Sequence, residues 1–427
     1  MSVEGLVSSL TLTSSRLWVR NSVKHPKIEI RQSKMAYVPL PSRPNQRVVI
    51  VGAGIVGSCV AAILSERLGS NIVLVDRDIR ELPGSTGHAP GFVGQYNELP
   101  VLTELAKRSV KYYQNIDGGF EQVGGLEVGQ DLEKRFEGAQ KEGLEAKVLN
   151  KEEILQIAGA FVRDDIPHGP AGVLFPFDGT ANAITIAYHQ QHKAASNGAT
   201  LLNADVKSII ESSSGNTRIL QTSRGRIDCH TVILCTGIWA SQLFSGFTQT
   251  VVPVAHPYSY SLPNNHQSKT PFIRWPSKHV YARDHGRMDG LGSYAHAPIH
   301  VHSDQIGETA YGQWEPSFDD VLKEGYSLLP QETAERFKGG QKFNGLFSVT
   351  PDGLPLVGKI EDGLWCAVAV WVTHAAGCAG LLADMFLGTT GERDAELRMA
   401  LDPKRFEGEG LENKALAKYN DIYNKVT

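Results

Sequence analysis

A glycine-rich turn near the front of the chain has the residue types and spacing that bind a dinucleotide. It contains Gly52, Gly54 and Gly57 in a GxGxxG pattern. Gly52 permits a tight turn, Gly54 lets backbone N–H groups approach a pyrophosphate, and Gly57 lets a helix pack closely on a strand. Asp76 lies 19 residues beyond Gly57, where a carboxylate can accept hydrogen bonds from a ribose. These residues predict a dinucleotide site; the alternative is a glycine-rich turn that binds no ligand.

The elements that position this turn follow from the apolar pattern. Residues 47–51 are an apolar run without alternation, which predicts a strand buried on both faces. A helix is expected over residues 58–68 and a second strand over 71–75. The positive end of the helix dipole would then face the phosphates.

A buried strand much later in the chain favours FAD over NAD. Residues 231–235 are apolar and end in Thr236-Gly237. A compact NAD domain normally finishes within about 150 residues, whereas two-domain flavoproteins return a late strand to the cofactor. A helix over 181–196 and a strand over 206–210 precede this return, and Val206 at the start of that strand is a further predicted cofactor contact.

The segment 83–91 is too polar and too rich in glycine for a helix, so we expect a loop that crosses toward the flavin ring. It contains Ser85, Thr86 and His88, which we predict to contact the cofactor. From the residues alone, the favoured interpretation of His88 is a histidine that is hydrogen-bonded within a tight loop.

The chain resembles the flavoprotein portion of dimethylglycine oxidases and dehydrogenases, with sarcosine dehydrogenase a near relative, in the D-amino-acid oxidase (DAO) group. The resemblance rests on segments spread over nearly the whole chain after residue 46: VGAGIVG (51–57), PGSTGHAPG (83–91), QVGGLEV (122–128), VAHPY (254–258), YARDHGRMDGLGSYAHAP (281–298), FNGLFSVTPDGLPLVG (343–358) and AVWVTHAAG (369–377). The usual loop of that family reads Ser-Thr-Ser-His-Ala-Pro-Gly, and Gly87 replaces its second serine here.

The resemblance implies an α/β fold, with an FAD-binding Rossmann-like domain of the glutathione-reductase type and an interleaved antiparallel-sheet substrate domain. It also implies that His88 carries the flavin covalently, from a ring nitrogen to the flavin 8α carbon; noncovalent FAD beside His88 is the alternative. Cofactor contacts are further expected in the C-terminal third, at Gly353, Gly358, Thr373, His374 and Gly377. A helix starting near residue 375 would stabilise the negative charge of the reduced flavin.

The substrate site is expected in the second half of the chain. Arginine binds a carboxylate in a bidentate manner, which makes Arg283 and Arg274 candidates for holding an acidic substrate, and we favour Arg283. Tyr258 lies in a segment where the family places a tyrosine facing substrate, and His256 has a side chain suited to keeping an amine deprotonated, because a histidine pKa lies near neutrality. Each has a structural alternative: a buried hydrogen-bonded ring or a surface ion pair.

A metal site is not predicted. Seven histidines fall between residues 256 and 302, but no HExxH motif occurs. Pro298 separates His296 from His300 and disfavours the helix that would place both on one face. The five cysteines form no CxxC pair and suit buried packing positions in a reducing compartment.

These observations and the resemblance lead us to expect an FAD-dependent oxidoreductase acting on CH–NH donors. The expected substrate is an N-methyl amino acid such as dimethylglycine or sarcosine, converted to the demethylated amine and formaldehyde, with electrons passing to oxygen or to an electron-transfer flavoprotein. The alternatives are another amine or amino acid as substrate, or a flavin-binding subunit without catalysis. The family members continue for several hundred residues into a folate-binding region, whereas this sequence stops at Thr427. No folate domain is therefore expected in cis.

Composition narrows the partners and leaves the compartment open. The chain has 42 Lys and Arg against 46 Asp and Glu, a net charge of −4, which gives no reason to expect nucleic-acid binding. No apolar run reaches the roughly 18–20 residues of a membrane span. Residues 1–46 are basic and rich in serine, as in an organelle transit peptide. The alternatives are a disordered leader that carries no targeting signal, or a true start at Met35. We expect an intracellular protein of the cytoplasm or the mitochondrial matrix.

The expected domains are discontinuous. Residues 47–95, 175–250 and 343–395 are assigned to the FAD domain and 96–174 and 251–342 to the substrate domain. Residues 396–427 are expected to be a C-terminal tail.

Overall fold

A computed structural model describes residues 40–129, 132–212, 217–264 and 269–422 of the chain. The leader expected over residues 1–46 and the alternative start at Met35 therefore lie almost wholly outside the described residues.

The molecule has two halves in space, and each contains segments from distant parts of the sequence. One half is built on a six-stranded sheet in the order β22-β23-β13-β1-β2-β9. Its strands are β1 (Val48–Val51), β2 (Ile72–Asp76), β9 (Thr200–Asn203), β13 (Thr231–Leu234), β22 (Leu356–Glu361) and β23 (Leu364–Val368). All are parallel except β22, and β1 lies between β2 and β13 with both faces buried. The late strand β13 thus returns beside the first strand, as the sequence predicted. The turn after β1 lies at the topological switch point of the sheet, because β2 and β13 lie on opposite sides of β1. Ligands usually bind at this point in such folds.

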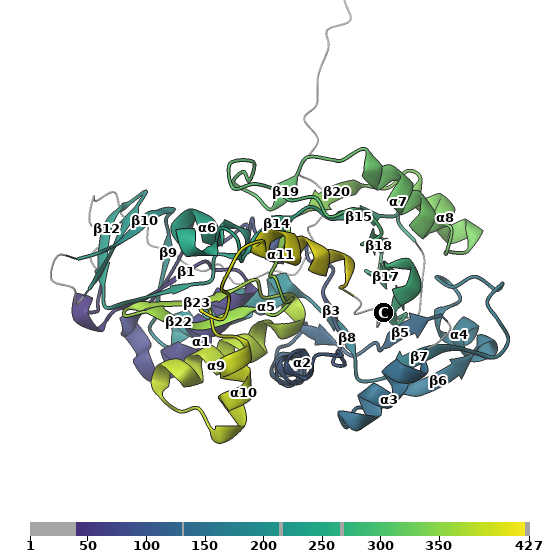
Figure 1. The fold of residues 1–427 in the computed structure, drawn as a ribbon, viewed down its shortest axis with the longest axis horizontal. Helices are drawn as coiled ribbons and strands as arrows, with labels where there is room; N and C mark the ends of the chain where they lie inside the picture. Colours follow the sequence, from purple (N-terminus) through teal and green to yellow (C-terminus); the bar gives the residue numbers. More distant parts are fainter. Residues whose placement is uncertain (1–39, 130–131, 213–216, 265–268, 423–427) are drawn as a thin grey trace, which may run out of the picture.

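Helices cover this sheet. Helix α1 (Ile55–Leu68) packs against α5 (Ala183–Ser196) and α9 (Ala375–Leu387), and α9 packs in turn on α2 (Pro100–Tyr113). Helix α1 begins three residues before the start expected from sequence, because Gly54 is already its N-cap. A small three-stranded meander lies beside this sheet (Figure 1): β10 (Val206–Glu211), β11 (Arg218–Thr222) and β12 (Gly225–Cys229).

The second half is built on a nine-stranded sheet in the order β19-β20-β15-β18-β17-β16-β5-β7-β6. Its strands are β5 (Gly125–Val128), β6 (Lys147–Asn150), β7 (Pro170–Phe175), β15 (Pro257–Tyr260), β16 (Phe272–Trp275), β17 (Val280–Asp284), β18 (Asp289–Ser293), β19 (Tyr311–Gly312) and β20 (Lys342–Gly345). The pairs are antiparallel except β16 with β5. Short helices line its outer end in Figure 1: α3 (Glu133–Lys141), α4 (Lys151–Ala158), α7 (Ser317–Tyr326) and α8 (Gln331–Phe337).

Two small sheets join the halves. Strands β3 (Phe92–Val93) and β4 (Phe120–Glu121) both pair with β8 (Gly179–Ala181). Strand β14 (Val252–Val254) pairs with β21 (Phe347–Val349). Strands β14 and β15 follow each other closely in sequence but belong to different sheets. His256 lies in the short connection between them. A short helix α6 (Ala240–Leu243) follows β13.

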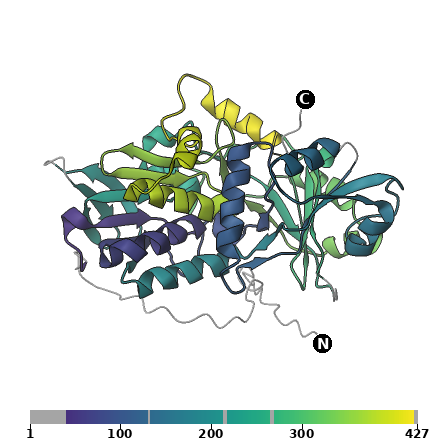
Figure 2. The ribbon, with the colours of Figure 1, turned by 90° about the horizontal axis from the view of Figure 1, so that it is seen from below.

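Two observations change the expected domain boundaries. Helix α2 lies between the two halves (Figure 2), and its apolar side chains belong to the same core cluster as α1 and α9. We propose that the boundary lies after Ile116 rather than before residue 96. The C-terminal segment is folded: α10 (Ala395–Ala400) adds Leu397 to that core, and α11 (Leu411–Asn420) packs on β14 and β21 (Figure 1).

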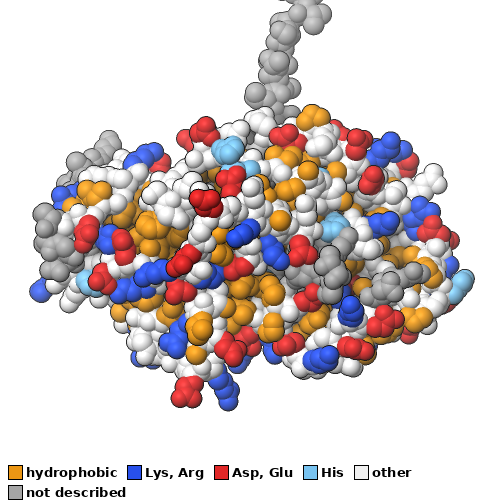
Figure 3. Space-filling view, viewed as in Figure 1, with side chains coloured by type: hydrophobic (Ala, Val, Ile, Leu, Met, Phe, Trp, Pro, Cys, Tyr) orange, Lys and Arg blue, Asp and Glu red, His pale blue; other side chains and the backbone are white. Residues whose placement is uncertain are grey.

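The surface has mixed charge. On the face shown in Figure 3, basic and acidic side chains are interspersed. Within the described ranges, no helix combines the length and the apolar character needed to cross a membrane. Among the residues that the structure describes, no three His, Cys, Asp or Glu side chains are grouped so that they could bind a metal ion.

Candidate active site

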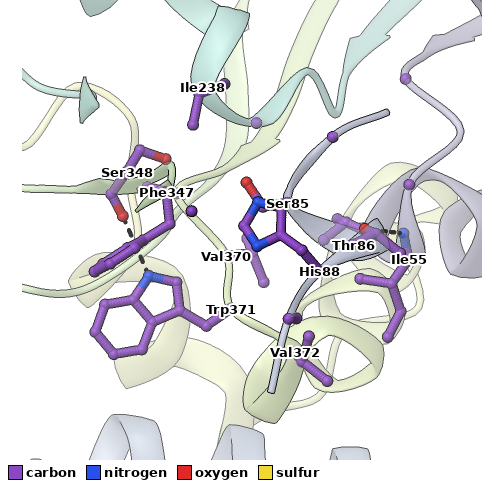
Figure 4. A pocket seen from close by; sticks show the side chains of 18 of the residues that line it. Ile55, Ser85, Thr86, His88, Ile238, Phe347, Ser348, Val370, Trp371 and Val372 are labelled. Carbon is purple, nitrogen blue, oxygen red and sulfur yellow. Dashed lines mark hydrogen bonds between the residues drawn. The ribbon is translucent and has the colours of Figure 1, made fainter. Parts of the chain in front are cut away.

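A cavity of about 680 Å³ runs from the turn after β1 into the nine-stranded sheet. Its lining comes from both halves of the molecule and from loops distant in sequence. Figure 4 shows part of it, with the segments of His88, Ile238, Ser348 and Trp371 around a common space. The cavity therefore joins the predicted dinucleotide site to the predicted substrate domain.

The glycine turn forms one end of the cavity. Gly52 and Gly54 line it, and Gly52 has a φ of +104°, which favours glycine. Gly57 does not line the cavity. A Cβ at Gly57 would collide with the Gly52 carbonyl oxygen and approach the Cys235 side chain to 3.1 Å. Gly57 thus permits close packing of α1, as expected from the sequence.

Asp76 ends β2 beside this turn and lines the cavity. Its carboxylate accepts hydrogen bonds from the backbone N–H groups of Ala53 (2.6 Å) and Asp78 (2.9 Å). Burial raises the pKa of Asp76, and these two hydrogen bonds oppose that effect. The carboxylate is thus held in place at the position predicted for a ribose contact. Val206 also lines this end of the cavity, as predicted. Arg77 and Trp239, which were not predicted from the sequence, line it too, and the Arg77 guanidinium lies 4.6 Å from the centroid of the Trp239 ring.

The loop after β2 brings Ser85, Thr86 and His88 to the middle of the cavity (Figure 4). The Ser85 hydroxyl donates to the Leu346 carbonyl (2.7 Å), and the Thr86 hydroxyl accepts from the Ile55 N–H (3.1 Å). The loop is therefore fixed to both halves of the protein.

His88 is enclosed by rings. Its centroid lies 4.9 Å from that of Tyr311 and 5.7 Å from that of Phe343. Its Nε2 is buried and has no hydrogen-bond partner among the described residues. Burial lowers the pKa of His88 to about 4, so the imidazole is neutral at physiological pH. A buried, neutral nitrogen without a partner calls for an explanation.

Three predicted cofactor contacts do not line the cavity. Gly353 lies in a turn with φ +78°, and Gly358 has φ +146° in β22 beside Pro403. A Cβ at Gly377 would collide with the Leu105 carbonyl oxygen, so this glycine permits α9 to pack on α2. Backbone geometry and helix packing, not contact with a ligand, explain glycine at these positions.

The start of α9 also differs from expectation. Thr373 and His374 line the cavity, and the Thr373 hydroxyl donates to the Phe92 carbonyl (2.9 Å). The N–H groups of Ala376 and Gly377, however, donate to side-chain oxygens of α2 (3.3 and 2.9 Å). These two donors of the helix start are therefore already satisfied within the protein, and burial lowers the pKa of His374 to about 4. Thr236 and Gly237 do line the cavity, and Thr236 Oγ1 is a buried polar atom with no partner in the described chain.

The far end of the cavity is an aromatic chamber, which we define by the lining residues Phe92, Tyr258, Phe272, Tyr281, Tyr294, Phe343 and Phe347. Tyr258 is buried, and its hydroxyl bonds His285 Nε2 at 2.8 Å. Burial raises the pKa of Tyr258 well above 10, so the phenol stays protonated.

His256 lines the chamber with both ring nitrogens engaged. Nε2 bonds the Tyr281 hydroxyl (2.7 Å) and Nδ1 bonds the Tyr419 hydroxyl (2.8 Å). The expectation of a near-neutral pKa is wrong, because burial lowers the pKa of His256 well below 6.5. His256 is therefore neutral at physiological pH.

The two candidate arginines have different positions. Arg283 does not line the cavity; its guanidinium donates to the Pro90 carbonyl in the His88 loop, which gives it a structural role there. Arg274 lines the chamber, and its Nη2 lies 3.3 Å from Glu127 Oε1. Glu127 also binds Arg135 through both carboxylate oxygens. The preference for Arg283 is thus corrected in favour of Arg274.

Sequence reasoning missed Tyr419 and Ile422, which come from α11 and the turn after it. Tyr419 is fully buried, and Ile422 lines the cavity. A signal was present, because Leu411, Ala415 and Tyr419 are spaced four apart and share one buried helix face.

The family model for FAD dependent oxidoreductases (DAO) matches residues 47–385, most of the chain. The chain belongs to the DAO family.

Individual relatives are distant. Human mitochondrial sarcosine dehydrogenase is 27% identical over 387 residues, which cover 83% of this chain and 41% of that protein. The 4-methylaminobutanoate oxidase (formaldehyde-forming) of Paenarthrobacter nicotinovorans is 22% identical over 395 residues, covering 87% of this chain and 46% of that one. This chain thus spans less than half the length of these curated relatives.

Among solved structures, L-proline dehydrogenase from P. horikoshii superposes with a TM-score of 0.70 at 21% identity, over 84% of this chain and 97% of that one. The predicted α/β fold of this DAO-family chain is therefore confirmed, as is the predicted enzyme class, an FAD-dependent oxidoreductase.

The DAO-family cavity fits FAD. The glycine turn leaves room at one end, Asp76 is positioned beside it, and two buried polar atoms that line the cavity, His88 Nε2 and Thr236 Oγ1, have no partner in the described residues. Buried polar atoms are normally satisfied, and a ligand would satisfy these.

Proposed function

We propose that this protein oxidises an N-methylated amino acid, of the dimethylglycine or sarcosine kind, to the demethylated amine and formaldehyde. The observation that carries the proposal is an aromatic chamber with Arg274 in its lining, at the end of the cavity whose other end is the glycine turn. The names of two relatives agree with it, since one acts on sarcosine and the other forms formaldehyde.

Arg274 is the proposed anchor for the substrate carboxylate. Its Nη2 lies 3.3 Å from Glu127 Oε1, and Glu127 gives both oxygens to Arg135. The charge of Glu127 is therefore divided between two guanidinium groups. Because Arg274 lines the cavity, a substrate carboxylate bound there would pair with its guanidinium, and charge-assisted pairs of this kind are strong.

The aromatic chamber suits the other end of the substrate. Its rings offer apolar surface to N-methyl groups and π-faces to a methylated ammonium, as in sites that recognise quaternary amines. FAD held in the cavity would supply the acceptor for a hydride equivalent from the N-methyl carbon. The protein has to hold that carbon in place, exclude water and receive the proton that leaves the nitrogen.

His88 is the proposed covalent attachment point for the flavin. A neutral imidazole is a nucleophile, and burial keeps His88 in this form. Attachment would replace a C–H bond at the 8α carbon and the imidazole N–H bond by a C–N bond, and the two electrons and two protons released would pass to an oxidant such as oxygen, giving hydrogen peroxide. Noncovalent FAD beside His88 is the alternative.

Acid precipitation of the holoprotein tests the bond. We expect the yellow colour to remain with the wild-type pellet and to pass into the supernatant for His88→Ala. Wild-type protein that releases all its flavin would refute the attachment. Ser85→Ala is the matched control, since its side chain lies in the same loop but is no nucleophile toward flavin in this proposal.

Anaerobic addition of sarcosine or dimethylglycine tests the substrate class. Bleaching of the flavin absorbance with release of formaldehyde supports the proposal. Bleaching only by other amines or amino acids would move the substrate to another member of that class. Absence of bleaching by all of them would favour a flavin-binding subunit. Readmitting oxygen and measuring hydrogen peroxide then separates an oxidase from an enzyme that needs an electron-transfer flavoprotein.

A further inference from the structure

A continuous chain of hydrogen-bonded side chains leads away from the aromatic chamber. Tyr281 bonds His256 (2.7 Å), His256 bonds Tyr419 (2.8 Å), and Tyr419 bonds His296 Nε2 (2.6 Å). His296 Nδ1 then bonds the Ala297 carbonyl (2.8 Å). Tyr281 and His256 line the cavity, whereas His296 is half-buried and Ala297 exposed. The chain therefore joins the cavity to the surface.

The outer end fixes the direction of every bond. A carbonyl only accepts, so His296 Nδ1 carries the hydrogen, and its neutral Nε2 must accept from Tyr419. The Tyr419 oxygen then accepts from His256 Nδ1, which leaves His256 Nε2 to accept from Tyr281. All these donors point outward, from the cavity to the surface.

We propose that this row of hydrogen-bonded side chains is a proton relay that connects the substrate amine to solvent through the C-terminal helix. The relay rests on the proposed amine oxidation. One proton leaves the substrate ammonium and arrives at the Tyr281 oxygen, each member passes its own hydrogen outward, and His296 becomes an imidazolium that can be solvated. No electron moves along the relay.

The arrangement also explains how a deeply buried histidine takes part. His256 receives a proton at Nε2 while it releases one from Nδ1, so the ring does not have to hold a net charge in an apolar site. Loss of the hydride equivalent leaves an iminium, which reacts with water to give the product ammonium and formaldehyde without a further proton. The released proton is recovered afterwards, when oxygen takes up the hydride equivalent together with one proton to give hydrogen peroxide, and that proton enters along the same path. That inward transfer restores the starting orientation of each bond, so protons balance over a turnover.

The position of Tyr419 makes the C-terminal helix part of this site. Helix α11 packs on β14 and β21, and it places the phenol between the two histidines (ring centroids 6.1 Å from His256 and 5.1 Å from His296). Tyr419→Phe keeps this packing and removes only the oxygen that links them. It therefore breaks the relay without opening a cavity.

Nitrogen NMR of the holoprotein tests the relay without turnover. With ¹⁵N-labelled histidine, we expect the Nδ1–H tautomer at both His256 and His296, with signals assigned by their loss in H256Q and H296Q. Tyr419→Phe should shift both sets of signals, while Tyr326→Phe, which loses a bond to Ser259 (2.8 Å), should shift neither. An Nε2–H tautomer at either histidine would oppose the bond directions and overturn the proposal.

Stopped-flow kinetics gives the second readout. With an indicator dye in weak buffer, proton release should accompany flavin reduction in wild type. Tyr419→Phe and His296→Gln should slow both by about tenfold or more, with the substrate Kd unchanged. His300→Gln is the matched control, because His300 is half-buried nearby and bonds Glu412 (2.9 Å) outside the relay. Rates for Tyr419→Phe within about twofold of wild type would overturn the relay. If no amine reduces the wild-type flavin, the proposed function fails and the tautomers alone decide the relay.

Discussion

Replacing Arg274 by glutamine should weaken binding of carboxylate ligands and leave the fold intact. The fold survives because Glu127 keeps its paired contacts to Arg135, so no buried charge is left without a partner. A hydrogen bond to a charged group contributes about 1.5–3 kcal/mol. At about 1.4 kcal/mol per tenfold change, Kd should rise about 10- to 100-fold.

The assay is an anaerobic titration of the flavin spectrum with methylthioacetate, which has the carboxylate and shape of the substrate but no amine. Its methyl ester lacks the charge, and we expect it to bind wild type and Arg274→Gln equally. Arg135→Gln is the matched structural control. It removes the paired contacts of Glu127, and we expect a loss of about 3–5 kcal/mol of unfolding free energy.

Two results would refute this reasoning. One is a Kd for methylthioacetate that is unchanged in Arg274→Gln while the protein remains folded. The other is a larger loss of affinity in Arg283→Gln than in Arg274→Gln, because the Arg283 guanidinium donates to the Pro90 carbonyl and does not line the cavity. The first result would remove Arg274 as the carboxylate anchor, and the second would return that role to Arg283.

Three further predictions follow from burial and packing. Burial raises the pKa of Asp178 from 3.8 to about 7, so the stability it contributes is full below about pH 4 and is lost as the pH rises through 7. At about 1.4 kcal/mol per pKa unit, the loss of unfolding free energy is of order 4 kcal/mol. Urea unfolding at about pH 5 and about pH 8 checks this, because the unfolding free energy of Asp178→Asn should differ less between the two pH values than that of wild type. Gly377→Ala should lower the unfolding free energy by about 1–3 kcal/mol, with or without flavin, because its Cβ meets the α2 backbone. Gly380→Ala in the same helix has open space and should be neutral or stabilising by about 0.5–1 kcal/mol; equal effects would contradict the packing argument. The five cysteines are all buried, which keeps their thiols protonated, so a thiol reagent should modify none in the native protein and all five in guanidinium chloride.

Local patterns placed the glycine turn and Asp76 together at one end of the cavity, and their contact with a nucleotide stays a prediction. The buried strand, the glycine turn and Asp76 lie within one βαβ unit, where spacing in sequence translates directly into position. The return of β13 beside β1 was also predictable, because a fully apolar strand ending in a small residue and glycine has few other places in such a sheet. The same reasoning failed for Gly353 and Gly377, since a glycine required by positive φ or helix packing looks the same in sequence as one required by a ligand.

The substrate end depended on contacts between distant segments. Arg274 and Tyr281 are cross-strand partners in β16 and β17, and both line the chamber. Arg283 lies two residues after Tyr281, on the same side of β17 by alternation, but the loop at Pro90 takes its guanidinium. Alternation gives the face of a strand, whereas the position of the cavity along it is set by a loop nearly two hundred residues earlier in the chain.

Tyr419 shows how far a single sequence carries such an argument. Its place on the apolar face of α11 predicts burial, and a buried phenol needs a hydrogen-bond partner. The sequence cannot name that partner, because the two histidines it bonds lie 163 and 123 residues away. Once the partners are known, the geometry requires more than burial: a tyrosine between two imidazoles, with a carbonyl at the outer end, has only one neutral arrangement of hydrogens. The direction of the relay is therefore a property of the tertiary structure, even though each residue in it is ordinary by itself.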